Sequence, residues 1–214
     1  RPQDRPRLLR LFADPAPPDT VREMPPLPAA RRPLAFPRPL LLFAGLLLGS
    51  VALALSAKIE VPFWPVPMTL ETLAVLGLAG LFGARLAGAA VLLWLAEGAA
   101  GLPVFAGAVA GPAYLLGPTG GYLLGFLLAA LLVGHLADHP AHRGLRTRPL
   151  LLFASMLVGV AVIYACGVAW LAHLIGWQRG FALGAAPFIP ADLTKTALAA
   201  ALVTASRRLG FSRG

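Results

Sequence analysis

Two ionisable residues stand three positions apart near the C-terminal end of this 214-residue chain, in a stretch that is otherwise largely apolar. At that spacing Asp192 and Lys195 would share one face of a helix, where they offer an acceptor and a donor to a small polar ligand. The alternative is an acid favoured by the helix dipole beside a lysine whose stem extends to the membrane surface. We expect a ligand site, because ionisable groups inside membrane spans are functional candidates by default.

Two further acids could contribute to such a site. Glu71 and Glu97 each lie at the end of an apolar run. Each either lines a cavity or sits at the membrane interface, and the sequence favours neither alternative.

Metal, nucleotide and catalytic motifs are weak or absent in this sequence. The spacing of His135, His139 and His142 could ligate a metal, but a proline interrupts the helix that would carry them. Cys166 is the single cysteine, which argues against an intrachain disulfide and a cysteine-based zinc cluster. The glycine-rich run at 117–121 lacks the Gly-Lys-Ser/Thr of a phosphate loop. We expect neither a metal site nor an enzyme.

The composition indicates which solvent surrounds most of the chain. Hydrophobic residues make up 58% of it and charged residues only 13%, whereas a soluble domain carries about 25% charged residues. These values argue against a soluble globular protein. The net charge of +9 could suggest a nucleic-acid partner, but most of the chain has no charged face to offer phosphates. We expect an integral membrane protein.

The apolar runs predict six membrane helices. A helix needs about 20 apolar residues to cross the hydrocarbon core. In a single span over 70–97, Arg85 would lie near the middle at a cost of about 2.5–3.5 kcal/mol. We therefore predict two short helices that meet at a turn from Gly83 to Arg85. The six expected helices cover residues 39–57, 69–83, 86–101, 119–137, 149–175 and 190–206.

The basic residues set the orientation of these helices. With the N-terminus inside, fifteen Lys and Arg residues lie in inner segments, while only Lys58 and Arg179 lie in outer ones. The positive-inside rule then holds throughout, so both termini are expected in the cytoplasm. Three regions follow: a disordered cytoplasmic tail rich in Pro and Arg over 1–38, a membrane domain over 39–208 and a C-terminal tail over 209–214.

Three apolar segments rich in Pro, Gly and aromatic residues connect the helices on the outer side, at 58–69, 102–118 and 176–189. Irregular backbone at membrane depth is tolerated where it is buried or lines a cavity, so we expect these segments to close over one. The alternative is an interfacial aromatic belt that includes Trp64 and Trp177.

Two small residues on the first helix allow another helix to approach closely. Gly45 and Gly49 are four residues apart. Internal packing and a partner protein explain this spacing equally well.

Four motifs together resemble the BioY family, the biotin-binding S components of energy-coupling-factor (ECF) transporters. They are VPFWPVPMTLETL, GLPVFAG, GPTGGY with a further glycine, and PFIPADLTK, at 61–73, 101–107, 117–125 and 187–195. The resemblance implies an all-α S-component fold with six transmembrane helices. It also implies biotin as the transported ligand, no cofactor, and a partner module of one transmembrane coupling protein with two ATPase subunits. Because small residues on the family's first helix contact the coupling protein, this role is implied for Gly45 and Gly49.

The resemblance further implies which residues bind biotin. Asp192 would accept a hydrogen bond from a ureido N–H, and Lys195 would donate to the ureido carbonyl while neutralising Asp192. The partner of the biotin carboxylate is left open between Lys58 and the backbone of the outer segments. The other expected binding residues pack the apolar rings or line the cavity: Trp64, Thr69, Glu71, Trp94, Phe105 and Tyr122.

The expected function is that of the substrate-binding membrane subunit of an ECF-type biotin importer in the cell (inner) membrane. It would capture biotin from the outer face and deliver it inward by reorienting against the coupling protein while the ATPases use ATP. Two other interpretations remain without the resemblance. One is a proton-coupled secondary carrier of a small carboxylate or vitamin using Glu71, Glu97 and Asp192. The other is an intramembrane enzyme with Asp192 as general acid or base.

Overall fold

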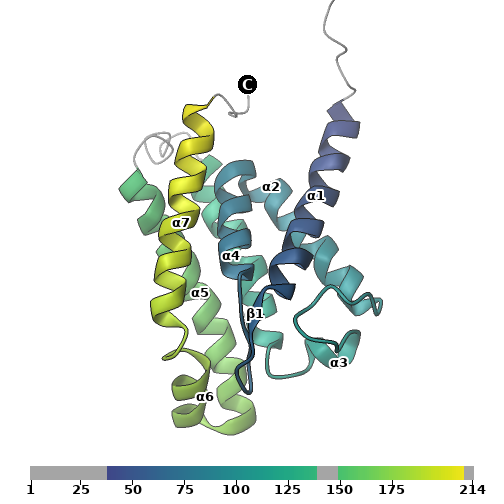
Figure 1. The fold of residues 1–214 in the computed structure, drawn as a ribbon, viewed down its shortest axis with the longest axis vertical. Coiled ribbons are helices and arrows are strands. Elements are labelled where there is room, and N and C mark those ends of the chain that lie inside the picture. Colours follow the sequence, from purple (N-terminus) through teal and green to yellow (C-terminus); the bar gives the residue numbers. More distant parts are fainter. Residues whose placement is uncertain (1–37, 139–148, 210–214) are drawn as a thin grey trace, which may run out of the picture. The chain divides into compact units, whose positions relative to one another are not determined.

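The computed structural model describes residues 38–138 and 149–209, most of which are helical (Figure 1). The long helices are α1 (Arg38–Lys58), α2 (Glu71–Ala99), α4 (Gly120–Asp138), α5 (Pro149–Ile175) and α7 (Ile189–Arg208). The short elements are α3 (Pro112–Leu115), α6 (Trp177–Gly184) and two strands, β1 (Glu60–Val61) and β2 (Met68–Thr69), which pair antiparallel.

Three of the sequence predictions fall on residues that the structure does not describe. These are the N-terminal tail up to residue 37, the basic loop that contains Arg143, Arg146 and Arg148, and the end of the chain from 210. His139 and His142 also lie in that loop.

Four predicted helices are confirmed to within two residues at each end. The predictions at 39–57, 119–137, 149–175 and 190–206 correspond to α1, α4, α5 and α7. Proline stands in the first turn of α5 and of α7, where its missing N–H would have no helical partner and its fixed φ suits the helix. The short helices α3 and α6 were not predicted, because each is too brief to produce a clear periodic pattern.

The predicted break in the second apolar region is confirmed at Gly83. Helical structure covers all of Glu71–Ala99, but Gly83 has φ 77° and ψ 179°, a conformation that a residue with a side chain rarely adopts. Leu78 and Ala90 both occupy the space beside Gly49 of α1. Twelve residues along a straight helix span about 18 Å, so α2 must turn back on itself. Figure 1 shows both halves of α2 extending from this turn toward the same end of the helices.

The turn of α2 is held by groups from two other helices. The backbone N–H of Ala84 donates to Oδ2 of Asp138 at the end of α4, at 2.9 Å. Arg207, in the last turn of α7, donates to the backbone carbonyl of Gly80. The three outer segments gather at the opposite end of the helices (Figure 1), where Lys58 Nζ donates to the carbonyls of Phe105 and Gly107 at 2.7 and 2.8 Å.

The core forms around α2, which contacts α1, α4, α5 and α7. Its fully buried members are mostly aliphatic, and they include Val75, Leu76, Val91, Val133, Met156, Leu171 and Val203. The outer faces of the helices are also apolar: Leu48 and Leu55 of α1 are 69% and 62% exposed. Large apolar side chains on both faces are expected for helices surrounded by lipid.

Within residues 38–138 and 149–209, four helices are long and apolar enough to cross a membrane, namely α1, α2, α4 and α5. The number is five if α6 and α7, which meet at a bend of 48°, are counted together as one span. The chain is therefore a multi-pass membrane protein, as its composition predicted.

Alanine at position 83 should destabilise the fold. Gly83→Ala would place a Cβ against the Asp138 carboxylate and force alanine to a positive φ, at a cost of about 1–2 kcal/mol before any displacement of Asp138. We expect a lower melting temperature for the detergent-solubilised protein. Gly77→Ala is the matched control on the same helix, because a Cβ there meets no atom within 4 Å. Equal melting temperatures for the two variants would contradict the turn at Gly83.

Candidate ligand-binding site

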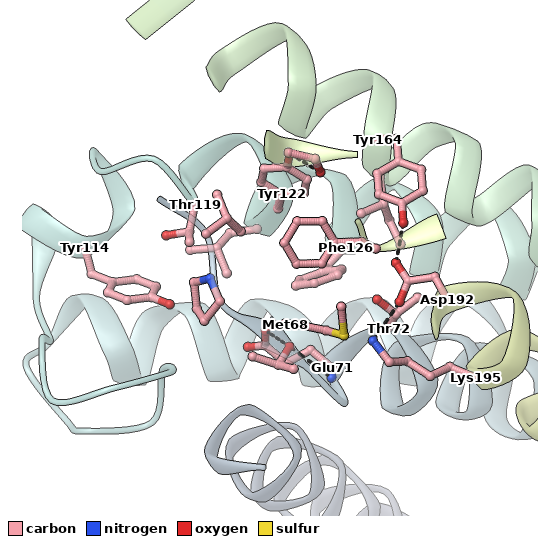
Figure 2. A pocket seen from close by; sticks show the side chains of 17 residues that line it. Met68, Glu71, Thr72, Tyr114, Thr119, Tyr122, Phe126, Tyr164, Asp192 and Lys195 are labelled. Atoms are coloured by element: carbon pink, nitrogen blue, oxygen red, sulfur yellow. Dashed lines mark hydrogen bonds and ion pairs between the residues drawn. The ribbon is translucent and has the colours of Figure 1, made fainter. Parts of the chain in front are cut away.

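A cavity opens among α2, α4, α5 and α7, at the end where the outer segments gather (Figure 2). Its volume is about 510 Å³ when the space at its mouth is included. All three outer segments contribute to its wall, which agrees with the expectation that they close over a cavity. The lining residues are Val66, Pro67, Met68, Thr69, Glu71, Thr72, Tyr114, Thr119, Tyr122, Leu123, Phe126, Ile163, Tyr164, Gly184, Phe188, Asp192 and Lys195.

An ion pair forms one end of this cavity. Lys195 Nζ lies 2.7 Å from Oδ1 of Asp192, and both side chains are about nine-tenths buried. The hydroxyl of Tyr164 on α5 donates to the other oxygen, Oδ2, at 2.6 Å. Asp192 lies in the first turn of α7, yet no side chain among the described residues caps this helix. Its carboxylate therefore pairs with Lys195 and Tyr164 and does not cap the N-terminus of the helix.

A second carboxylate lines the cavity with one oxygen unpaired. Glu71 begins α2 and is 6% exposed. Its Oε2 accepts a hydrogen bond of 2.6 Å from the hydroxyl of Thr69, while its Oε1 is buried without a hydrogen-bond partner among the described residues. A buried carboxylate oxygen without a donor is unfavourable. A ligand with an N–H group in this cavity would supply the missing donor.

Aromatic rings form the rest of the wall. The Tyr122 hydroxyl donates to the backbone carbonyl of Gly184 at 2.8 Å, which directs its polar end to the backbone and leaves its ring to line the cavity. Phe126 lies beside it in Figure 2. At the end away from Asp192, the ring of Tyr114 stacks on Phe105 with centroids 4.7 Å apart. Burial raises the pKa of the Tyr114 phenol, so its hydroxyl keeps its proton and remains a donor.

The structure brings five of the predicted binding residues together in the wall of this cavity: Thr69, Glu71, Tyr122, Asp192 and Lys195. It places the other three elsewhere. Trp64 is 79% exposed and lies outside the cavity wall. Trp94 and Phe105 are fully buried behind the wall, where their rings pack edge to face with centroids 5.1 Å apart. Neither residue lines the cavity, so the structure does not support their expected contact with a ligand.

Packing against a glycine explains where Phe105 lies. Its ring fills the space that a side chain would take at Gly98 of α2, and Trp94 Nε1 donates to the carbonyl of Val104 at 3.1 Å. These contacts attach the outer segment at 102–118 to the second half of α2. Trp94 and Phe105 support the wall from behind.

Gly45 and Gly49 of α1 pack against another helix of this protein, α2. Leu86 lies beside Gly45, and Ala90 and Leu78 lie beside Gly49. This arrangement favours the internal-packing alternative, and the expected contact with a coupling protein stays a prediction. Glu97 is also absent from the cavity wall: it accepts a hydrogen bond from Ser50 of α1.

Several residues of the wall were missed by the sequence analysis. The most informative is Tyr164, which lies within the long uncharged run of α5 and contacts Asp192. A phenol within an uncharged run is the signal that could have marked Tyr164 as a site residue. The sequence could not pair it with Asp192, which lies 28 residues further along the chain. The others are Val66, Pro67, Met68, Thr72, Tyr114, Thr119, Leu123, Phe126, Ile163, Gly184 and Phe188.

No group of three or more His, Cys, Asp or Glu side chains able to hold a metal ion occurs within residues 38–138 and 149–209. The cavity wall offers instead two carboxylates, one ammonium and several hydroxyl groups beside apolar rings. This arrangement suits a ligand with a small polar head that carries both donors and an acceptor, attached to an apolar body.

Removal of the buried charge of Glu71 should stabilise the ligand-free protein. Glu71→Gln keeps an oxygen to accept from Thr69 and puts a neutral amide in place of the carboxylate. A neutral amide costs less to bury than a carboxylate, even where its N–H groups lack an acceptor, which predicts a gain of about 1 kcal/mol. Thermal unfolding in detergent would measure it. Glu97→Gln is the matched control, since that carboxylate is only half-buried and has Ser50 as a partner. A lower melting temperature for Glu71→Gln would show that the carboxylate is already well paired.

The sequence model of the BioY family matches residues 33–211 of this chain. A probable biotin transporter BioY from Pyrococcus horikoshii is 40% identical over 147 residues, which cover 68% of this chain and 83% of that protein. The biotin transporter BioY of Rhizobium etli is 36% identical over 166 residues, or 75% and 87% of the two chains. The fold is similar to a crystal structure of the S-component for biotin from an ECF-type ABC transporter. The TM-score is 0.66 at 23% identity, covering 81% of this chain and 95% of the other.

Proposed function

Because the chain belongs to the BioY family, whose members are transporter components and not enzymes, we propose that it is the substrate-binding membrane subunit of an ECF-type biotin importer. The observation that carries the proposal is the buried Asp192–Lys195 pair in the wall of an otherwise aromatic cavity. The relatives named as biotin transporters and the S-component fold support the same conclusion.

The polar groups of the cavity are complementary to the ureido ring of biotin. That ring carries two N–H donors on either side of a carbonyl acceptor. Lys195 would donate to the carbonyl, and Asp192 would accept from one N–H with a lone pair that its protein partners leave free. The unpaired Oε1 of Glu71 is available for the second N–H. Tyr122 and Phe126 would pack against the apolar rings of the ligand.

The carboxylate of biotin would extend toward the outer segments. A second hollow, lined by Glu60, Gly107 and others, shares Pro67, Tyr114 and Thr119 with the cavity. Lys58 Nζ lies 2.8 Å from the carbonyl of Gly107, which places an ammonium group beside this hollow. Lys58 and the backbone of the outer segment at 102–118 both remain candidates for the carboxylate contact.

We place the protein in the cell (inner) membrane with six crossings and both termini in the cytoplasm. The reversal of α2 at Gly83 supports this arrangement, because it allows each half of α2 to cross separately. Arg85, Arg207 and Arg208 then lie on the cytoplasmic side, and Lys58 and Arg179 lie outside, as the positive-inside rule requires. The halves are short, so the bilayer must thin around them or the flanking residues must complete the crossing.

The proposed partners are one transmembrane coupling protein and two ATPase subunits, with membrane lipid around the helices. The protein would hold biotin while ATP hydrolysis elsewhere reorients it, and it would itself make and break no covalent bond. Gly45 and Gly49 would contribute indirectly to the surface that contacts the coupling protein. They let α1 lie close to α2 and so set the position of the exposed face of α1.

Titration calorimetry of the detergent-solubilised chain tests the ligand and the two central residues. We expect saturable 1:1 binding of biotin, and an affinity about 10- to 100-fold lower in Asp192→Asn and in Lys195→Ala, because hydrogen bonds to charged groups contribute about 1.5–3 kcal/mol each. Arg179→Ala, an exposed residue of α6, serves as the control and should bind like the unchanged chain. Biotin binding that both pocket variants retain in full would refute the assigned roles.

Uptake into proteoliposomes separates the proposal from a proton-coupled carrier. With the coupling protein and both ATPases present, biotin accumulation should require ATP and should continue when a protonophore collapses the proton gradient. Vesicles with an ATPase subunit inactivated provide the control. Accumulation that follows the proton gradient and ignores ATP would identify a secondary carrier instead.

A further inference from the structure

The carboxylate of Asp192 is held from two helices at once. Its Oδ1 pairs with Lys195 Nζ on the same helix, α7, at 2.7 Å, and its Oδ2 accepts from the hydroxyl of Tyr164 on α5 at 2.6 Å. Figure 2 shows the carboxylate between these two groups at one end of the cavity. Each oxygen therefore has one side-chain donor within residues 38–138 and 149–209.

The two contacts have different mechanical consequences. A pair at positions i and i+3 of one helix holds both members through flexible side chains, so Lys195 alone leaves the carboxylate free to rotate. A phenol carried by a rigid ring on a neighbouring helix fixes the second oxygen and with it the plane of the carboxylate. An ionised carboxylate has about four lone-pair positions. With one used on each oxygen, the remaining positions have defined directions.

We infer that Tyr164 is a positioning residue, which orients Asp192 so that a free lone pair meets an N–H group of the ligand. The inference rests on the proposed function, since it assigns the tyrosine a role in recognition of the ureido ring. Orientation before binding increases affinity, because the side chain does not have to be ordered when the ligand arrives. The same fixed direction disfavours ring systems that present no N–H at that point.

The two parts of the Tyr164 side chain have separable roles. Its ring lines the cavity and also an apolar groove formed with Trp177 and Phe181 on the other side. Its hydroxyl contacts Asp192. Tyr164→Phe therefore keeps the ring that closes the wall and removes only the group that orients the carboxylate.

A double-mutant cycle on biotin affinity tests the inference with the full chain in detergent. Tyr164→Phe should weaken biotin binding about tenfold or more, as expected for a lost hydrogen bond to a charged group. In the Asp192→Asn background the same change should have less than about a threefold effect, because the carboxylate that it orients is gone. Where binding is too weak for calorimetry, the rise in melting temperature at a fixed biotin concentration gives the same comparison.

Ser155→Ala is the matched control for loss of a hydroxyl from α5. The Ser155 hydroxyl donates to the carbonyl of Leu152 in its own helix at 2.7 Å and lies outside the cavity wall, so biotin affinity should be unchanged. Equal effects of Tyr164→Phe in both backgrounds would indicate a general structural role and overturn the inference, as would unchanged binding by Tyr164→Phe alone. A chain that binds no biotin at all overturns the proposed function together with it.

Discussion

The reversal of α2 at Gly83 is the constraint on which the rest of the fold depends. Every other long helix packs against α2, and the turn brings Leu78 and Ala90 to the same point on α1. The turn exists because Gly83 adopts a positive φ, and it is stabilised by Asp138, which accepts from the first free backbone N–H after the break. A backbone N–H that loses its helical acceptor at such a break needs another hydrogen-bond partner, which the Asp138 carboxylate supplies.

The same requirement explains the side-chain donors that surround the outer segments. These segments contain only the short elements β1, β2, α3 and α6, so many of their backbone carbonyls lie outside helices and strands or at the end of a short helix. Trp94 donates to Val104, Trp170 to Gly117 and Tyr122 to Gly184, while Lys58 donates to two carbonyls. Each of these donors comes from one of the long helices. The segments are thereby attached to the helices at several points, and the cavity beneath them keeps its shape.

The cavity itself is built from groups that cost stability when no ligand is bound. Asp192 is compensated by Lys195 and Tyr164, but one oxygen of Glu71 has no hydrogen-bond partner in the part of the chain that the structure describes. Apolar residues in these places would give a more stable core. These groups fit a binding protein, because the polar head group of a ligand would supply the missing hydrogen-bond partner in the wall and offset the lost stability.

The sequence by itself determined the features that depend on local composition. The apolar runs and prolines placed α1, α4, α5 and α7, an arginine between two glycines placed the turn of α2, and a spacing of three put Asp192 beside Lys195. The tertiary structure alone decided which side chains share the cavity. Trp94 and Phe105 resembled ligand contacts, yet packing over Gly98 places them behind the wall. Tyr164 stood out only as a phenol in an uncharged run, and packing between α5 and α7 makes it a partner of Asp192, 28 residues away. Local patterns fix helices, because their hydrogen bonds join near neighbours. The partners of a buried group are chosen by packing between helices, and no sequence spacing encodes that choice.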